Sequence, residues 1–363
     1  MLTARLADHT VVYDLVTEVV HVLNPTAGLV WELGDGSTEV ERLVSELAEV
    51  TGAPVDEVAA DVHAYLTSLE ELGLVGRKQP LDAAPSFAAV AASGAHASAT
   101  FGVIDDGVVV RSDDTALIAS IDSLLGSLAS KRPITVTLGV RPDDRGTLVL
   151  SGHGDDRAYA SAEALLEALP TALNQIAAAT STCIALHAGC VRSPSGEVVL
   201  LPAVSGSGKT TLTAGLVRVG WDYATDEAVG VRARSLLAVG YPKPLVLDPM
   251  SREVLRLAPS PSSNTAPTEL RADVAIAIGD VGPVDRVVLP RYEPGALLQI
   301  ELLDPPQAVV AVLEHALNLR LVGQPGLEAL CELALRVPVL RLVHSDINEA
   351  VAAVTDSSSR PGE

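Results

Sequence analysis

Residues 198–219 contain the residue types that hold a chain of phosphates. An apolar run, VVLLPAV, leads into a glycine-rich turn, and an amphipathic segment follows Lys209 and Thr210. This order predicts a strand, a loop and a helix, with loop N–H groups converging at the positive end of the helix. The pattern G-x-x-x-x-G-K-[ST] is matched except at its first position, which is Ala203. The residues predicted to bind ATP or GTP are Ser205, Gly206, Ser207, Gly208, Lys209, Thr210 and Thr211.

A pair of acidic residues, Asp226 and Glu227, follows the short β-like run 221–225. Carboxylates at the end of a strand that follows such a helix can hold Mg²⁺ together with the Thr210 hydroxyl. Asp226 could equally accept the proton of an attacking hydroxyl. The alternative interpretation of the pair is a solvated turn.

Two further residues have two interpretations each. His187 lies in the apolar run 183–191, expected to be one buried strand, and is either a core residue or part of the site. Lys243 lies between two prolines that fix its loop, so it either presents a cation to a transferring phosphate or lies in a rigid, exposed turn. Residues 259–267, PSPSSNTAP, are expected to form a mobile loop and conceivably a lid.

The segments LHAGCV, SGSGKTT, GWDYATDE, YPKPLVLD and RLVHSDINEAV together resemble the HPr kinase-related proteins, over residues 101–355. The resemblance implies a P-loop domain with a mixed sheet and His187 near the active site. It also implies that Asp226 and Glu227 serve in metal binding and proton abstraction, and that the chain forms a homo-oligomer. The second glycine-rich signature of true HPr kinases is missing, so the sugar-transport protein HPr is not the expected substrate.

Residues 1–78 are expected to form a module of their own. Runs of β-forming residues at 11–13 and 19–23 predict a hairpin, and three helices are expected to begin near Pro25, Thr38 and Pro54. Thr38 and Glu41 have the spacing of a capping box, and the third helix is expected to end at Gly73. A hairpin followed by three short helices predicts a winged-helix-like module.

The segments VVYD, VHVLNPTAGLVWELGDG and SLEELGLV resemble the PqqD-like family, the peptide-recognition elements of ribosomal-peptide (RiPP) biosynthesis. The resemblance implies that the leader of a ribosomally made precursor peptide adds as a strand beside the hairpin and packs on the third helix. The residues that it implies for this groove are Val19, Val20, His21, Val22, Leu23, Asp61, Tyr65 and Ser68.

Charge argues against nucleic acid as a partner. A DNA-binding winged helix is the alternative for the first module, but residues 1–78 hold four basic residues against fourteen acidic ones. The whole chain has a net charge of −21 and a pI near 4.7, which also disfavours an anionic membrane surface. Three cysteines without paired spacing, and no visible signal peptide, predict a cytoplasmic protein.

The remaining segments show no chemistry. Residues 79–100 are expected to connect the modules, short strands and helices at 114–128 and 161–180 to follow, and residues 356–363 to form a disordered tail. The expected fold is therefore multidomain α/β. The leading hypothesis is ATP- and Mg²⁺-dependent phosphorylation of a hydroxyl on a precursor peptide. A non-catalytic adaptor that recruits the peptide to other modifying enzymes is the alternative, and a kinase for a small metabolite is a third hypothesis.

Overall fold

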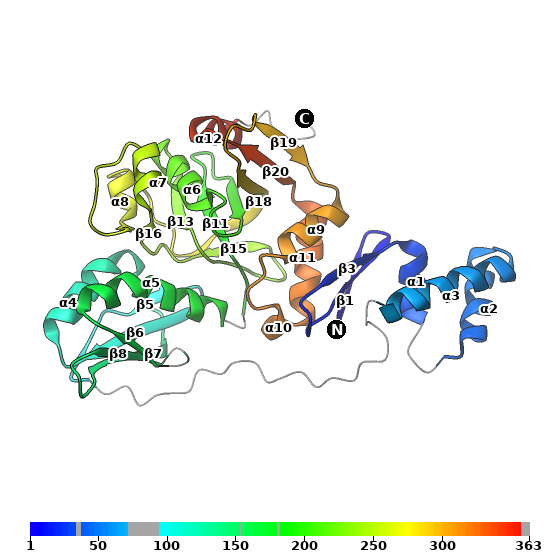
Figure 1. Cartoon of the computed structure of the whole chain (residues 1–363), viewed down its shortest axis with the longest axis horizontal. Coiled ribbons are helices and arrows are strands. Elements are labelled where there is room, and N and C mark those ends of the chain that lie inside the picture. The colour runs from blue at the N-terminus through cyan, green and yellow to red at the C-terminus, as the bar shows by residue number, and fades with distance from the viewer. Residues whose placement is uncertain (34–37, 72–93, 153, 155, 180–181, 357–363) are drawn as a thin grey trace. The chain divides into compact units, whose positions relative to one another are not determined.

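The computed structural model describes residues 1–33, 38–71, 94–152, 154, 156–179 and 182–356. The chain divides into two compact units, Met1–Ala83 and Ala84–Glu363 (Figure 1). The predicted helix end at Gly73, most of the predicted connection 79–100 and residues 357–363 of the predicted tail lie outside the described residues. No helix in the described ranges combines the length and the apolar character needed to cross a membrane.

The first unit contains a small antiparallel sheet followed by three helices. The strands, in the order in which they pair, are β1 (Leu2–Leu6), β2 (His9–Tyr13) and β3 (Val20–Leu23). The helices are α1 (Pro25–Leu33), α2 (Val40–Thr51) and α3 (Val55–Glu71). The predicted hairpin is β2–β3, and β1 is a strand that the sequence pattern did not reveal.

The helix starts in this unit follow from local chemistry, with one correction. The Asn24 side chain accepts a hydrogen bond from the Ala27 N–H, as expected for an N-cap with proline in the first turn. The predicted capping position of α2 was wrong, because the N-cap is Glu39 rather than Thr38 and Glu39 makes no side-chain capping bond. Apolar residues of the three helices, including Val30, Leu47 and Val62, form one core.

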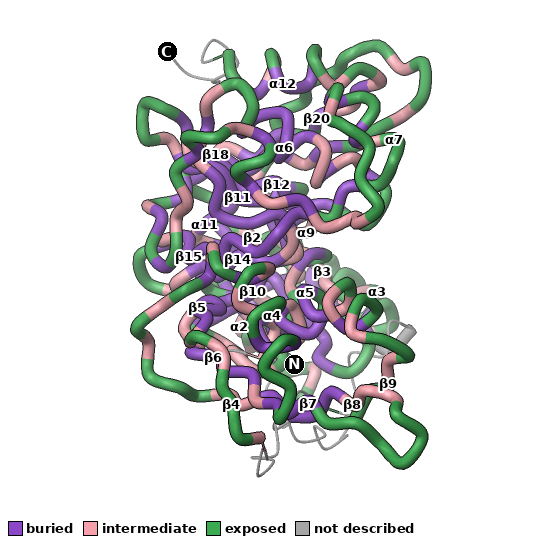
Figure 2. The backbone as a smooth tube through the Cα atoms, turned by 90° about the vertical axis from the view of Figure 1, so that its left-hand side faces the viewer, coloured by how far each residue is buried: buried purple, intermediate pink, exposed green. Residues whose placement is uncertain are grey.

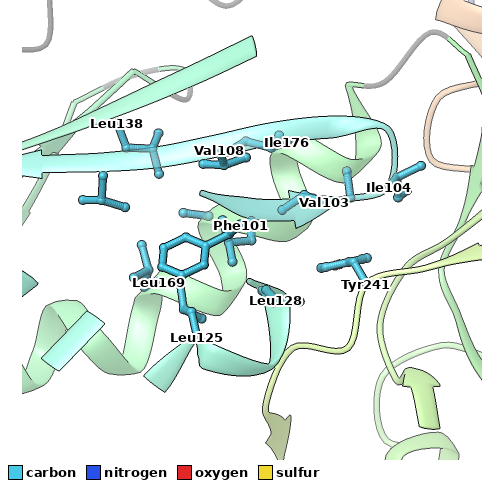
Figure 3. Close-up of a cluster of buried hydrophobic side chains, with 14 of the residues drawn as sticks. Phe101, Val103, Ile104, Val108, Leu125, Leu128, Leu138, Leu169, Ile176 and Tyr241 are labelled. Carbon is cyan, nitrogen blue, oxygen red and sulfur yellow. The ribbon is translucent and has the colours of Figure 1, made fainter. Parts of the chain in front are cut away.

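The second unit begins with a six-stranded sheet. Its strands are β4 (His96–Ala97), β5 (Phe101–Val103), β6 (Asp106–Ser112), β7 (Ile134–Pro142), β8 (Leu148–Ser151) and β9 (Arg157–Tyr159). Its helices are α4 (Thr115–Leu124), the 3₁₀ turn η1 (Gly126–Leu128) and α5 (Ala162–Ala178). The predicted helix 114–128 is thus interrupted at Leu125. Figure 3 shows Phe101 packed among Leu125, Leu128 and Leu169 in the core between this sheet and its helices.

The rest of the second unit surrounds a nine-stranded mixed sheet, buried at its centre (Figure 2). The order of strands is β10 (Ile184–Leu186), β14 (Val229–Val231), β15 (Leu237–Gly240), β18 (Gly279–Tyr292), β12 (Val198–Pro202), β11 (Ala188–Arg192) and β13 (Asp222–Thr225), with β20 (Val339–His344) beside β18 and β19 (Gln299–Leu302) beside β20. A separate pair consists of β16 (Leu245–Val246) and β17 (Asn264–Thr265). The helices are α6 (Lys209–Arg218), α7 (Pro249–Val254), α8 (Pro267–Leu270), α9 (Pro305–Leu313), α10 (Leu319–Val322), α11 (Gln324–Arg336) and α12 (Ile347–Thr355).

One sequence prediction for this sheet was wrong. The run 183–191 is two strands rather than one, since the chain breaks at His187 between β10 and β11. Strand β18 is 14 residues long and pairs with β15 through its first half and β20 through its second.

The segment 259–267 is anchored, in contrast to the predicted mobile loop. The Ser262 and Ser263 hydroxyls both donate to the Glu167 carboxylate, and the Leu247 N–H donates to the Ser263 carbonyl. Residues 264 and 265 pair with β16. These bonds fix the segment against its neighbours, so the structure gives no support to a lid.

Candidate functional site

The glycine-rich loop, residues 203–208, joins the fully buried strand β12 to helix α6 (Figure 1). Gly206 and Gly208 have φ angles of 81° and 86°, a left-handed conformation that favours glycine. Gly208 is the N-cap of α6 and no side chain caps the helix. N–H groups of the first turn are therefore left to bind a ligand, and an anion suits this end of a helix. Thr211 faces away, since its hydroxyl bonds that of Ser251 in α7.

Lys209, His187 and Glu227 form a chain of polar contacts beside this loop. Lys209 is 5% exposed, and its Nζ lies 2.7 Å from Nε2 of His187. Nδ1 of His187 lies 3.4 Å from Oε1 of Glu227. Burial, together with the charge of Lys209, lowers the pKa of His187 to about 4. The imidazole is therefore neutral near pH 7, accepting from Lys209 through Nε2 and holding its proton on Nδ1, which faces Glu227.

Asp226 and Lys243 form a buried ion pair next to this chain. Both residues are fully buried, and Nζ of Lys243 lies 2.8 Å from Oδ1 of Asp226. The Tyr223 hydroxyl also lies 3.0 Å from Oδ1. The solvated-turn interpretation of Asp226 was wrong, and so were both interpretations of Lys243, which neither lies in an exposed turn nor is free to meet a phosphate. Oδ2 of Asp226 is buried and has no hydrogen-bond partner among the described residues.

His315 is a neighbour of the site that the sequence did not indicate. It follows α9, and its carbonyl oxygen accepts a hydrogen bond from the N–H of His187, which fixes the break between β10 and β11. Burial, with the charges of His187 and Lys209, lowers the pKa of His315 to about 4. No motif surrounds this histidine in the sequence, because its role depends on a contact made across the fold.

The two lowered histidine pKa values predict acid sensitivity. In the unfolded chain a histidine binds its proton near pH 6.5, whereas His187 and His315 do so only near pH 4 in the folded chain. The unfolded state therefore binds more protons between these values, and lowering the pH from 6.5 to 4.5 should cost up to about 2 kcal/mol per histidine. Thermal melting across this range should show a smaller loss for His315→Gln than for the unmodified chain. His63→Gln, at an exposed histidine of α3, is the control and should leave the pH profile unchanged.

The residues predicted to hold Mg²⁺ come from two segments near Lys209, the start of α6 and the end of β13. Thr210 is half-buried at the start of α6, and Asp226 and Glu227 follow β13. The part of the chain described by the structure contains no group of three or more histidine, cysteine or acidic side chains arranged to hold a metal ion. The unpartnered Oδ2 of Asp226 fits a cation or a bound water, and the remaining ligands would have to be phosphate oxygens and water.

The predicted peptide-binding strand is β3, an edge strand whose one pairing partner among the described strands is β2. The N–H of Asp14 donates to the carbonyl of Val19. Because hydrogen-bonded and non-hydrogen-bonded residue pairs alternate along an antiparallel pair of strands, the N–H groups of Val20 and Val22 point away from β2, to the unpaired side of β3. Val19 is exposed, His21 half-buried and Leu23 buried. Backbone groups on this open side are therefore free to pair with an added strand.

The predicted helix residues lie along α3 at helical spacing. Asp61 and Ser68 are exposed, and the Ser68 hydroxyl donates to the carbonyl of Ala64 in the same helix. Tyr65 is half-buried, its hydroxyl lacks a hydrogen-bond partner among the described residues, and burial raises its pKa to about 12. In the described ranges no hydrogen bond or ion pair joins these three residues to β3.

Comparisons with known proteins concern the first unit. Residues 9–75 match the family model described as coenzyme PQQ synthesis protein D (PqqD). A search of curated proteins gave no match. Among 29 similar chains of solved structures is TbiB1 in complex with the TbiA(beta) leader peptide, with 20% identity and a TM-score of 0.20, covering 22% of this chain and 92% of that chain. Residues 9–75 are thus similar to the PqqD family, and that match ends before the unit that contains the glycine-rich loop.

Proposed function

We propose that this protein binds the leader of a ribosomally synthesised precursor peptide and phosphorylates a hydroxyl on that peptide, using ATP or GTP with Mg²⁺. The proposed phosphorylation activity rests mainly on the position of Lys209. It begins α6 directly after the uncapped glycine-rich loop and is linked through His187 to Glu227. Groups suited to phosphate binding and to proton transfer therefore meet at one end of β12.

Each residue has a separate role in the proposed reaction. Loop N–H groups and Lys209 stabilise the charge that develops on the γ-phosphoryl group. Thr210 and Glu227 would hold Mg²⁺, which would supply positive charge to offset that of the phosphates. Lys243 holds the Asp226 carboxylate in place through Oδ1, and the unpartnered Oδ2 accepts the proton of the attacking hydroxyl. His187 positions Lys209 and is not itself a base.

The PqqD-like unit supplies the proposed peptide contact. Its β3 edge offers unpaired backbone groups, and an extended leader would add there as a further strand. Leader binding raises the local concentration of the acceptor hydroxyl to about 1 mM for a short flexible connection, so the catalytic unit need not bind the acceptor tightly.

A proline substitution tests this strand edge. Val22→Pro removes an outward N–H from β3 without removing a β2–β3 hydrogen bond, and should weaken binding of a leader peptide about 10-fold or more. The measurement is calorimetric titration with a synthetic peptide that carries the leader of a candidate precursor. Arg5→Pro, on the opposite edge strand β1, is the matched control and should bind normally. Equal losses in both variants would show that the effect is not specific to the β3 edge.

The adaptor remains the second candidate, and the complete burial of Asp226 favours it. A base that solvent cannot reach must become accessible before it can serve an acceptor hydroxyl. An adaptor would bind leader and pass the peptide to other modifying enzymes, without nucleotide turnover. The small-metabolite kinase predicts instead that removing residues 1–78 leaves activity intact.

The deciding experiment incubates the candidate precursor with γ-labelled ATP and Mg²⁺. Label on the peptide supports phosphotransfer, provided that it disappears with Lys209→Ala and persists with Lys131→Ala, a change at an exposed lysine. Leader binding without label, and without nucleotide hydrolysis, supports the adaptor. Label on small molecules only would support the third hypothesis.

A further inference from the structure

The two flanks of the glycine-rich loop differ in chemistry. In the sheet, β12 lies between β11 and β18. Beyond β11 lies β13, which ends at the acidic pair of Asp226 and Glu227. On the other flank the parallel strands β18 and β20 end together at Tyr292 and His344, which are register partners. In open α/β sheets, ligands bind outside the carboxyl ends of the parallel strands.

Tyr292 and His344 lie directly against the loop. The N–H of Tyr292 donates to the carbonyl of Ser207 at 3.0 Å. A Cβ placed on Gly208 would lie 3.4 Å from Cβ of Tyr292 and 3.7 Å from Nε2 of His344. The residues that end β18 and β20 therefore form one wall of the loop.

This wall combines an exposed aromatic ring with buried polar groups. Tyr292 is 44% exposed, in a chain with only 3% aromatic residues. His344 is 2% exposed and packs edge-on to the Tyr292 ring, with centroids 5.8 Å apart at 61°. The buried Ser207 hydroxyl has no hydrogen-bond partner among the described residues. Neither ring nitrogen of His344 makes a well-aligned hydrogen bond there, although the Asp346 backbone interacts with the ring. An exposed ring held from one side, beside an unsatisfied buried hydroxyl, suits a planar ligand with polar groups.

We propose that Tyr292 and His344 form the nucleoside subsite, with the purine base stacked on the Tyr292 ring and His344 as the positioning residue beneath it. This inference rests on the proposed nucleotide-binding function. A nucleoside triphosphate is a linear ligand, and its reacting phosphate must face the acidic pair on the β13 flank. The nucleoside end then extends toward the opposite flank, where β18 and β20 end. Base–aromatic stacking tolerates any base, so the subsite accepts ATP and GTP alike.

The test compares ATP with inorganic tripolyphosphate, which has the phosphates but no base. Calorimetric titrations in Mg²⁺ use the full chain and four variants: Tyr292→Ala, Tyr292→Trp, His344→Phe and Leu297→Ala, the last being a matched exposed control in the loop after β18. Tyr292→Ala should weaken ATP binding about 5- to 100-fold and leave tripolyphosphate binding within about twofold. Tyr292→Trp should keep ATP affinity, and its added fluorescence should be quenched by ATP but not by tripolyphosphate. His344→Phe should weaken ATP binding less than Tyr292→Ala does.

Other outcomes overturn the inference in distinguishable ways. Equal losses for both ligands in Tyr292→Ala would mean that the residue supports the loop and does not contact a base. Equal affinity of the unmodified chain for ATP and tripolyphosphate would retain the phosphate site and exclude a base subsite. If neither ligand binds the unmodified chain, the proposed nucleotide function fails, and the subsite fails with it.

Discussion

Replacing Lys209 with alanine should reduce peptide phosphorylation at least about 10²-fold, the scale of losing one group that stabilises transition-state charge. The side chain is almost fully buried beside the loop, so no other lysine among the described residues can take its place. Lys243 is also buried near the acidic pair, but its ammonium group is ion-paired with Asp226. Single-turnover rates with γ-labelled ATP measure the effect, and Lys131→Ala should be unchanged. Retention of more than about a tenth of the activity would contradict the role assigned to Lys209.

The same residue predicts how nucleotide affinity depends on pH. Burial lowers the pKa of Lys209 to about 8, although the charges of Glu227 and Asp226 oppose the shift. The free protein therefore loses this cation as the pH rises from 7 to 9, and ATP affinity should fall over that range. Arginine stays protonated throughout, so Lys209→Arg should flatten the profile even if it binds less tightly. A profile that is already flat in the unmodified chain would place phosphate binding elsewhere.

Breaking the Asp226–Lys243 pair should be the most destabilising change in the second unit. Lys243→Met leaves the Asp226 carboxylate buried without its counter-charge, at an expected cost of about 3–5 kcal/mol in the free energy of unfolding. Asp226→Asn should also lower the free energy of unfolding, because it leaves the Lys243 ammonium buried without its counter-charge. If Asp226 is the base, this variant should reduce phosphotransfer about 10²–10⁴-fold. Urea titration followed by tryptophan fluorescence measures this loss. With Trp31 replaced by phenylalanine, the buried Trp221 is the one tryptophan left, so the signal reports unfolding of the second unit.

The double variant separates the contribution of the Asp226–Lys243 ion pair to stability from the proposed role of Asp226 as a base. Asp226→Asn with Lys243→Met removes both charges, so its loss of stability should be smaller than the sum of the two single losses. Its phosphotransfer should stay absent, because restored stability does not restore a base. Glu301→Gln, which breaks an exposed pair with Arg341, is the control and should change stability by no more than about 0.5 kcal/mol. Strict additivity of the two single variants would mean that the pair is not coupled.

Features encoded by contiguous residues could be predicted from the sequence. The strand, loop and helix around Lys209 form as expected, because β-forming residues, glycines and an amphipathic segment follow one another directly. The β2–β3 hairpin and the acidic pair after β13 follow for the same reason. Three motif segments of the first module resemble the PqqD-like family, and the family-model match over residues 9–75 supports that resemblance. Local conformation and turn chemistry are properties of neighbouring residues, and the sequence displays them in order.

The partners of the site residues were decided by the tertiary structure alone. Lys243, for which the sequence left a phosphate contact and an exposed turn open, lies buried against Asp226, and no motif indicated His315 or Tyr292. These contacts arise because the order of strands in the sheet differs from their order in the chain, so β18 comes to lie beside β12, with β20 on its far side. Periodicity reports which face of a strand is buried, but which strands become neighbours depends on packing summed over the whole sheet.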